Sequence, residues 1–183
     1  MISERAKSGF EQLLKDALAE NLVLSSAESC VIQPLPDASA IQEKEFVVLT
    51  ISSYLFRLIA LSYFTPNADT KARFAELNKT SLENLSNSAF YDAVAEYGNR
   101  FCGTLNRSVG RYFPHVGMST PNILDRGCGS YLTTLGARHI RHFQVALGET
   151  SVYHATLAIC DYGNLDFQLE VGTADATGEL ELF

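Results

Sequence analysis

Two polar side chains of complementary chemistry stand three residues apart near the middle of the sequence. Glu96 supplies a carboxylate, and Asn99 supplies a carboxamide that can both donate and accept hydrogen bonds. On a helix, residues at i and i+3 are neighbours on the surface, so the two groups would be presented together. A helix also holds polar groups more accurately than a loop does. Glu96 and Asn99 are therefore the first candidates for chemistry in this chain.

The surrounding segment, from about Ser88 to Gly110, has the two-faced pattern of a long helix. At about 100° per residue, one arc of roughly 80° collects apolar residues: Phe90, Val94, Tyr97, Phe101, Leu105 and Tyr112. The opposite arc holds Asp92, Glu96, Asn99, Gly103, Asn106 and Gly110. A glycine inside a helix costs about 1 kcal/mol relative to alanine, but it lets another molecule approach the backbone. The pattern is compatible with a docking face, and equally with a solvated face on which Glu96 pairs with Arg100.

The segment from Asp92 to Gly103 resembles the D/S-xxx-E-xx-N-xxx-G signature of the CheC/CheX/FliY phosphatases of bacterial chemotaxis. Asp92, Glu96, Asn99 and Gly103 occupy the signature positions. The segment 118–127 is similar to the Ser-Thr-Pro turn and following glycine of CheX-like proteins. Residues 68–86 contain no second Glu-xx-Asn spacing. The resemblance is thus to a single-site, CheX-like chain.

This resemblance implies hydrolysis of the aspartyl phosphate on a CheY-type response regulator. Glu96 and Asn99 would enter the regulator's active site as the catalytic pair, Asn99 positioning the attacking water and Glu96 pairing with a regulator lysine. The chain would need no cofactor of its own, because Mg²⁺ would be held by the regulator's carboxylates. The alternative is a non-catalytic adaptor that binds a receiver domain or a flagellar switch component through the same face.

Four further residues are expected to contribute to partner binding. Gly103 would leave room for close docking, and Asp92 would stand in the first helical turn, where it favours the helix dipole. Asn106 and Arg107 follow the glycine, where family members often carry a basic residue. The resemblance also suggests a homodimer formed through an exposed sheet edge.

The composition excludes some classes of partner. The 14 Lys and Arg residues against 21 Asp and Glu leave a formal net charge of -7, which would repel nucleic acid. We expect no membrane span, since no apolar run reaches about 20 residues, and hence a cytoplasmic protein. The four cysteines are expected to be small buried residues. We expect no metal site either, because His139 and His142 would face opposite sides of a strand.

The patterning predicts one α+β domain over residues 1–183, with an antiparallel sheet and helices packed on one face. An amphipathic helix should end near Asn21, and a strand should cover residues 22–32. The run 46–64 reads as two strands bent at Ser52-Ser53, or else as one buried helix. The remaining expectations are a short helix over 69–78 capped by Asn67 or Asp69, a loop over 114–129, and a three-stranded meander over 141–147, 153–159 and 165–171.

Overall fold

The computed structural model describes residues 1–81, 86–149 and 151–170. An antiparallel sheet of seven strands forms its centre, in the order β1-β6-β7-β3-β2-β4, with β5 also paired to β2. The strands are β1 (Cys30–Leu35), β2 (Glu45–Ser52), β3 (Phe56–Phe64), β4 (Gly117–Met118), β5 (Asn122–Asp125), β6 (His139–Leu147) and β7 (Ser151–Asp161). The helices are α1 (Glu4–Leu22), α2 (Ala68–Leu77), α3 (Asn87–Gly110) and the 3₁₀ helix η2 (Arg126–Tyr131).

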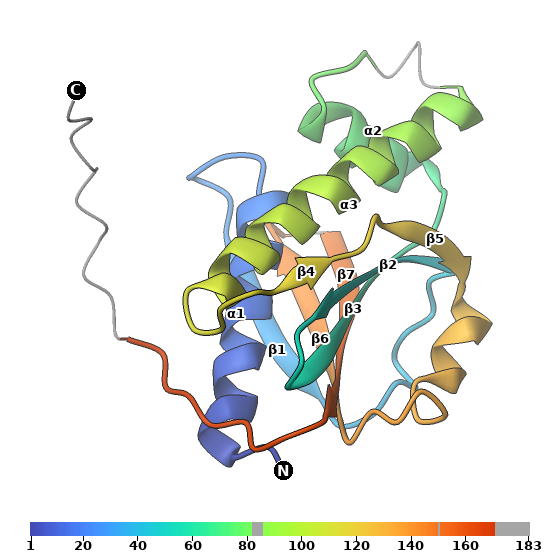
Figure 1. Cartoon of the computed structure of the whole chain (residues 1–183). Helices are drawn as coiled ribbons and strands as arrows, with labels where there is room; N and C mark the ends of the chain where they lie inside the picture. Colours follow the sequence, from blue (N-terminus) through green and yellow to red (C-terminus); the bar gives the residue numbers. More distant parts are fainter. Residues whose placement is uncertain (82–85, 150, 171–183) are drawn as a thin grey trace, which may run out of the picture.

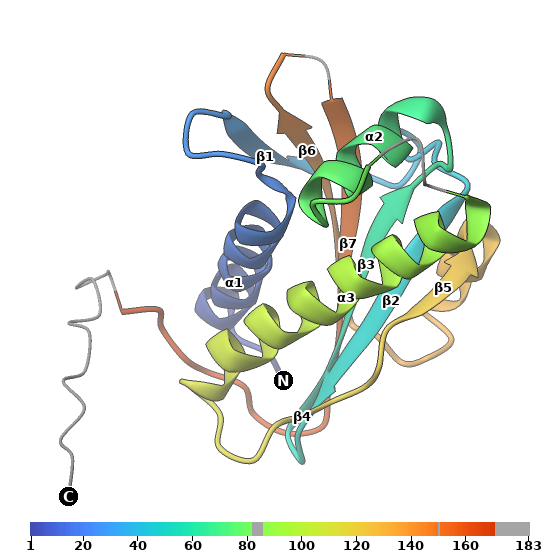
Figure 2. The same ribbon diagram turned by 90° about the horizontal axis from the view of Figure 1, so that it is seen from above.

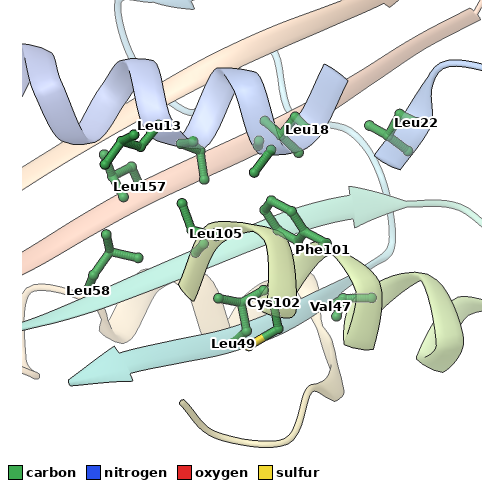
Figure 3. Packing of buried hydrophobic residues seen from close by; sticks show 14 of the residues in the cluster. Leu13, Leu18, Leu22, Val47, Leu49, Leu58, Phe101, Cys102, Leu105 and Leu157 are labelled. Carbon is green, nitrogen blue, oxygen red and sulfur yellow. The ribbon is translucent and has the colours of Figure 1, made fainter. Parts of the chain in front are cut away.

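The main core lies between the sheet and the two long helices, α1 and α3 (Figures 1 and 2). Each helix lays its apolar stripe on the strands, and the stripes also meet each other. Figure 3 shows this layer, in which Leu13 and Leu18 of α1 and Phe101 and Leu105 of α3 lie in one cluster with Leu58 and Leu157 of the strands. The predicted α+β fold, an antiparallel sheet with helices packed on one face, is confirmed.

The opposite face of the sheet is covered without an α-helix. A second apolar cluster there includes Phe46, Leu61 and Tyr63 from the strands, with Ile41 and Leu132 from the segments that cover them. Figure 1 shows the sheet separating α1 from η2, which lies among these covering segments. Because both faces of the sheet are covered, the central strand β3 is buried at nearly every position.

Several predicted elements agree with the structure. Helix α1 ends at Leu22, one residue beyond the expected Asn21, and residues 46–64 form two strands joined at Ser53 rather than one helix. Helix α2 begins after Asn67, whose side chain accepts a hydrogen bond from the Thr70 amide at 2.9 Å. Within the described residues no helix is long and apolar enough to span a membrane.

The first predicted strand was misplaced. The sequence pattern favoured residues 22–32 and took Pro34 as the end of the strand, whereas β1 covers Cys30–Leu35 and contains Pro34. In the part of the chain that the structure describes, strand β1 pairs with β6 alone and is an edge strand. A proline is tolerated at an edge because its missing amide hydrogen costs no ladder bond on the free side.

The third strand of the predicted meander was also wrong for residues 165–170. Strand β7 is already paired on both sides, with β6 and β3, so no edge is open to it. The apolar residues of this segment turn to α1 instead: Leu165 accepts a hydrogen bond from the Ser3 amide at 3.0 Å, and Phe167 packs on Phe10. Val171 lies outside the described residues.

The predicted loop over 114–129 contains the short strands β4 and β5 and the start of η2. Both strands pair with β2, which would otherwise be an open edge, and they are too short to show a periodic pattern. The cysteine prediction holds only in part. All four are free thiols and Cys102 and Cys160 are buried, but Cys30 is half-buried and Cys128 is exposed.

Candidate functional site

Helix α3 is fixed in rotation about its axis by its buried side. The side chain of Ser86 caps its first turn by accepting a hydrogen bond from the Ala89 amide. Tyr97 is fully buried, and its hydroxyl lies 2.8 Å from the hydroxyl of Ser62 on β3. Burial raises the pKa of Tyr97 well above its usual range, so this phenol stays protonated. The opposite side of the helix must therefore face outward.

We call that outward stripe the α3 crest, and define it as Asp92, Glu96, Asn99, Gly103 and Arg107. The four residues with side chains are exposed, and Glu96 retains 58% of its side-chain surface. A Cβ atom added to Gly103 would meet no atom within 4 Å. The exposure predicted from helical periodicity for Glu96 and Asn99 is thus confirmed. Their roles, and those of the other crest residues, stay predictions.

A segment that we call the strap, residues 116–121, runs along one flank of α3 (Figures 1 and 2). Three contacts along one side of the helix define its path, at Gly110, Cys102 and Gly98. Val116 would be 3.6 Å from a Cβ at Gly110, the Cys102 thiol donates to the Ser119 carbonyl at 3.6 Å, and Pro121 faces Gly98. The Ser119 amide also donates to the Thr50 carbonyl of β2 at 2.9 Å, and the Thr50 amide donates to the Ser119 hydroxyl at 3.0 Å, which fixes the strap to the sheet.

Asn106 differs from its predicted position on the open face. It lies on the same helical row as Cys102 and Gly110, which both contact the strap, and it is half-buried. Its Oδ1 atom is buried and has no hydrogen-bond partner among the described residues. The helical wheel missed this because the covering segment comes from outside the helix.

Asp92 stands in the second turn of α3, not in the first as predicted, because the helix begins at Asn87. A carboxylate beyond the first turn gains little from the helix dipole. Its exposed position one turn before Glu96 makes it part of the crest instead.

Among the described residues, Glu96 has one neighbour of opposite charge, Arg100. An Arg100 nitrogen lies 3.8 Å from Glu96 Oε1, and the same nitrogen donates to Asn78 Oδ1 at the shorter distance of 2.9 Å. Surface pairs of this kind contribute at most about 1 kcal/mol. The Glu96 carboxylate is therefore close to a cation but remains open to another donor. Asn99 makes no hydrogen bond to any described residue, so its amide is equally open.

The histidines are engaged separately. His139 pairs with Glu11 at 3.0 Å, His142 with Thr156 at 2.8 Å and His154 with Glu43 at 2.6 Å. In the part of the chain that the structure describes, no three His, Cys, Asp or Glu side chains are grouped so as to hold a metal ion.

Sequence reasoning missed the packing role of Gly98. A Cβ at Gly98 would lie 2.8 Å from Val47 and 2.9 Å from Pro121, so only glycine lets α3 approach both β2 and the strap. The sequence did carry a signal for this contact. Gly98 lies four residues before Cys102, on a side of the helix other than the crest, and Pro121 follows in the Ser-Thr-Pro turn. This signal could be interpreted only once the strap's course was known.

Comparison with known proteins shows which solved structures share this fold. Neither a family model nor a curated protein matches the sequence. Solved structures do match: CheX from Vibrio vulnificus has a TM-score of 0.58 at 13% identity, with 84% of this chain and 98% of that chain covered. The chain has a CheX-like fold.

Two further structures agree with this assignment. The CheX-CheY-BeF3-Mg²⁺ complex from Borrelia burgdorferi matches with a TM-score of 0.57 at 14% identity, over 85% of this chain and 97% of that chain. A CheC-like superfamily protein from Shewanella sp. PV-4 matches with a TM-score of 0.55 at 9% identity, over 86% and 98%. The CheX-like fold thus extends over most of the chain, well beyond the short motif on α3.

Proposed function

We propose that this protein hydrolyses the aspartyl phosphate of a CheY-type response regulator. The observation that carries the proposal is the joint exposure of Glu96 and Asn99 on a rigid helix, beside a glycine that leaves the backbone accessible. Support from outside the chain is the CheX-like fold and the fact that one CheX of this fold was solved together with CheY, BeF3 and Mg²⁺.

Asn99 would position the attacking water. An acyl phosphate is already an activated substrate, so the main task is to hold a water molecule in line with the phosphorus atom. The Asn99 side-chain oxygen can accept a hydrogen bond from that water without carrying a charge, which avoids repulsion by the phosphoryl oxygens. The amide of Asn99 suits this task because it forms no hydrogen bond to a described residue that would have to be broken first.

Glu96 would dock the regulator. Its carboxylate reaches into solvent and is held only loosely by Arg100, so a lysine of the partner could replace that contact. Mg²⁺ would remain on the regulator's own carboxylates. Asp92, Gly103 and Arg107 would extend the contact along the crest, whereas Asn106 would contribute through its exposed atoms only.

A radiolabel assay tests the proposal. The protein is mixed with a CheY-type regulator carrying a ³²P-labelled aspartyl phosphate and Mg²⁺, and label loss is followed. We expect Asn99→Ala to slow the hydrolysis about 100-fold, the scale seen when one aligned polar group is removed from an active site. Asn164→Ala, at an exposed asparagine after β7, is the matched control and should leave the rate unchanged.

The same assay separates hydrolysis from adaptor function. Glu96→Gln should weaken binding to the regulator more than it slows the bound reaction, because the docking charge is lost while Asn99 remains. If the phospho-regulator binds but its label decays at the uncatalysed rate with the wild-type protein, the adaptor is correct. If it neither binds nor loses label, both functions are wrong.

A homodimer and a cytoplasmic location are parts of the same proposal. Strand β1 has β6 as its one partner among the described strands, and Val31 on it keeps 49% of its surface exposed. A second copy could pair along this edge. Analytical ultracentrifugation of the wild-type protein and of Val31→Lys would test it, because a charge on the paired edge should shift the population to monomer.

A further inference from the structure

A cavity of about 500 Å³ lies on the sheet face opposite α3. It is lined by residues of the segment 38–42, of the segment 126–133, and of strands β3 and β6. Cavities of roughly 300–1,000 Å³ are the size that small ligands occupy. Nothing in the proposed phosphatase function uses this cavity, since the crest lies on the other side of the sheet (Figure 1).

Two of the lining residues, Tyr63 and His142, are joined by a chain of polar side chains on neighbouring strands. His142 Nδ1 lies 2.8 Å from Thr156 Oγ1, and the Thr156 hydroxyl donates to the Tyr63 hydroxyl at 3.2 Å. Thr156 is fully buried and Tyr63 is only 4% exposed. Three polar side chains among apolar neighbours cost stability unless they are satisfied, so their presence on this face needs a reason.

The direction of these hydrogen bonds determines which donor and acceptor groups remain available to a ligand in the cavity. Since Thr156 has a single hydroxyl hydrogen and gives it to Tyr63, the proton between Thr156 and His142 must come from His142 Nδ1. Burial lowers the pKa of His142, so its ring is neutral and Nε2 is a bare acceptor. The Tyr63 hydroxyl hydrogen finds no acceptor among the described residues. One donor and one acceptor are thus left over.

Part of the remaining lining is apolar. Ile41, Leu132 and Ile140 contribute apolar walls that would penalise burial of an ion. Arg126, an exposed residue of the lining, already donates to the Ile41 carbonyl at 2.9 Å.

We propose that this cavity binds an uncharged, planar small molecule in which a carbonyl stands beside an N–H group, as in a cyclic amide. The carbonyl accepts the Tyr63 hydroxyl hydrogen, and the N–H donates to His142 Nε2. The ring lies against Ile41, Leu132 and Ile140. Ser39 and Ser130, whose hydroxyl donates to the Gly127 carbonyl at 2.7 Å, stand at the margin and need not contact the ligand.

The test is a titration of the ¹⁵N-labelled protein followed by NMR, with three probes of similar size. 2-Pyridone carries the carbonyl and the N–H, N-methyl-2-pyridone lacks the donor, and benzoate carries a charge. We expect 2-pyridone to cause saturable shifts in the amides of residues 38–42 and 126–133 but not in those of α3. The methylated probe should bind at least about tenfold more weakly, the effect of one lost hydrogen bond worth about 1.4 kcal/mol.

Variants and a ring-nitrogen measurement complete the design. Tyr63→Phe should weaken 2-pyridone binding about tenfold, whereas Tyr54→Phe, at an exposed tyrosine of the β2–β3 turn, should not. If Tyr63→Phe does not fold, the ¹⁵N resonances of His142 in the wild-type protein decide: we expect the Nδ1–H tautomer and a shift of Nε2 that saturates with 2-pyridone.

Three results would overturn the proposal. They are the absence of saturable shifts in the two lining segments, tighter binding of benzoate than of 2-pyridone, and a His142 ring that does not respond to the probe. None of them bears on hydrolysis at the crest, so the two proposals can fail separately.

Discussion

Two glycines five residues apart on α3 illustrate how differently one residue type can act. Gly98 is buried between Val47 and Pro121, and a Cβ there would overlap both. Gly103 faces open space, so its only structural effect is the lower helix propensity of glycine. Packing requires the first glycine. The second weakens the helix and leaves its backbone accessible on the crest.

We predict opposite stability changes for alanine at these two positions. Gly103→Ala should raise the free energy of unfolding by up to about 1 kcal/mol, because alanine is the better helix former. Gly98→Ala should lower it by about 1–3 kcal/mol, because the added methyl group overpacks the contact with β2 and the strap. Urea unfolding of both variants beside the wild-type protein measures this. Changes of the same sign would contradict the packing described for α3.

At the scale of elements, Asn78 joins α2 to α3. Its Nδ2 group donates to the Phe74 carbonyl of α2 at 2.8 Å and to the Ala93 carbonyl of α3 at 3.2 Å. Its Oδ1 atom accepts from Arg100. One side chain therefore ends α2, contacts the backbone of α3 and holds the arginine that stands beside Glu96.

Replacing this residue should loosen α2 against α3. We expect Asn78→Ala to lower the free energy of unfolding by about 1–3 kcal/mol, because hydrogen bonds that are partly buried lose their partner. Asn164→Ala should stay within about 0.5 kcal/mol of the wild-type protein. Hydrogen exchange adds an element-level readout, since α2 amides should lose more protection than β3 amides. Equal loss everywhere would mean that Asn78 does not act locally.

At the scale of the whole molecule, Arg73 ties three parts of the chain together. From α2 it donates to the Leu22 carbonyl at the end of α1 at 3.0 Å, and it forms an ion pair with Glu28 at 2.6 Å. The side chains of Arg73 and Glu28 are only 9% and 13% exposed. The hydrogen bond from Arg73 holds the pKa of Glu28 below its ordinary value of 4.5.

This pair should contribute to acid sensitivity. Because the folded pKa of Glu28 is depressed, its stabilisation is present above the ordinary value of 4.5 and is lost as the pH falls through the lower folded value. Glu28→Gln should therefore be less stable than the wild-type protein at neutral pH, with a smaller difference at a pH of about 3. Urea unfolding at both pH values checks this. Glu170→Gln, at an exposed position, should show no such convergence.

Local periodicity allowed much of the fold to be predicted. The stripe on α3, the cap at Asn67 and the break at Ser52-Ser53 are all governed by neighbours within a few residues, and each prediction is confirmed. The third meander strand failed because alternation shows that one side of a segment is buried, but not what buries it. Phe167 meets Phe10 of α1 instead of a neighbouring strand.

The sequence by itself determined that a carboxylate and a carboxamide stand together on the outer face of α3, because a helix repeats every 3.6 residues whatever surrounds it. Only the tertiary structure decided what flanks them. Asn106 is half-buried, Gly98 admits Pro121, and Asn78 holds Arg100 beside Glu96. The contacts of Gly98 with Pro121 and of Asn78 with Arg100 join residues that are 23 and 22 positions apart, and no local pattern encodes how a distant segment returns to pack on the helix.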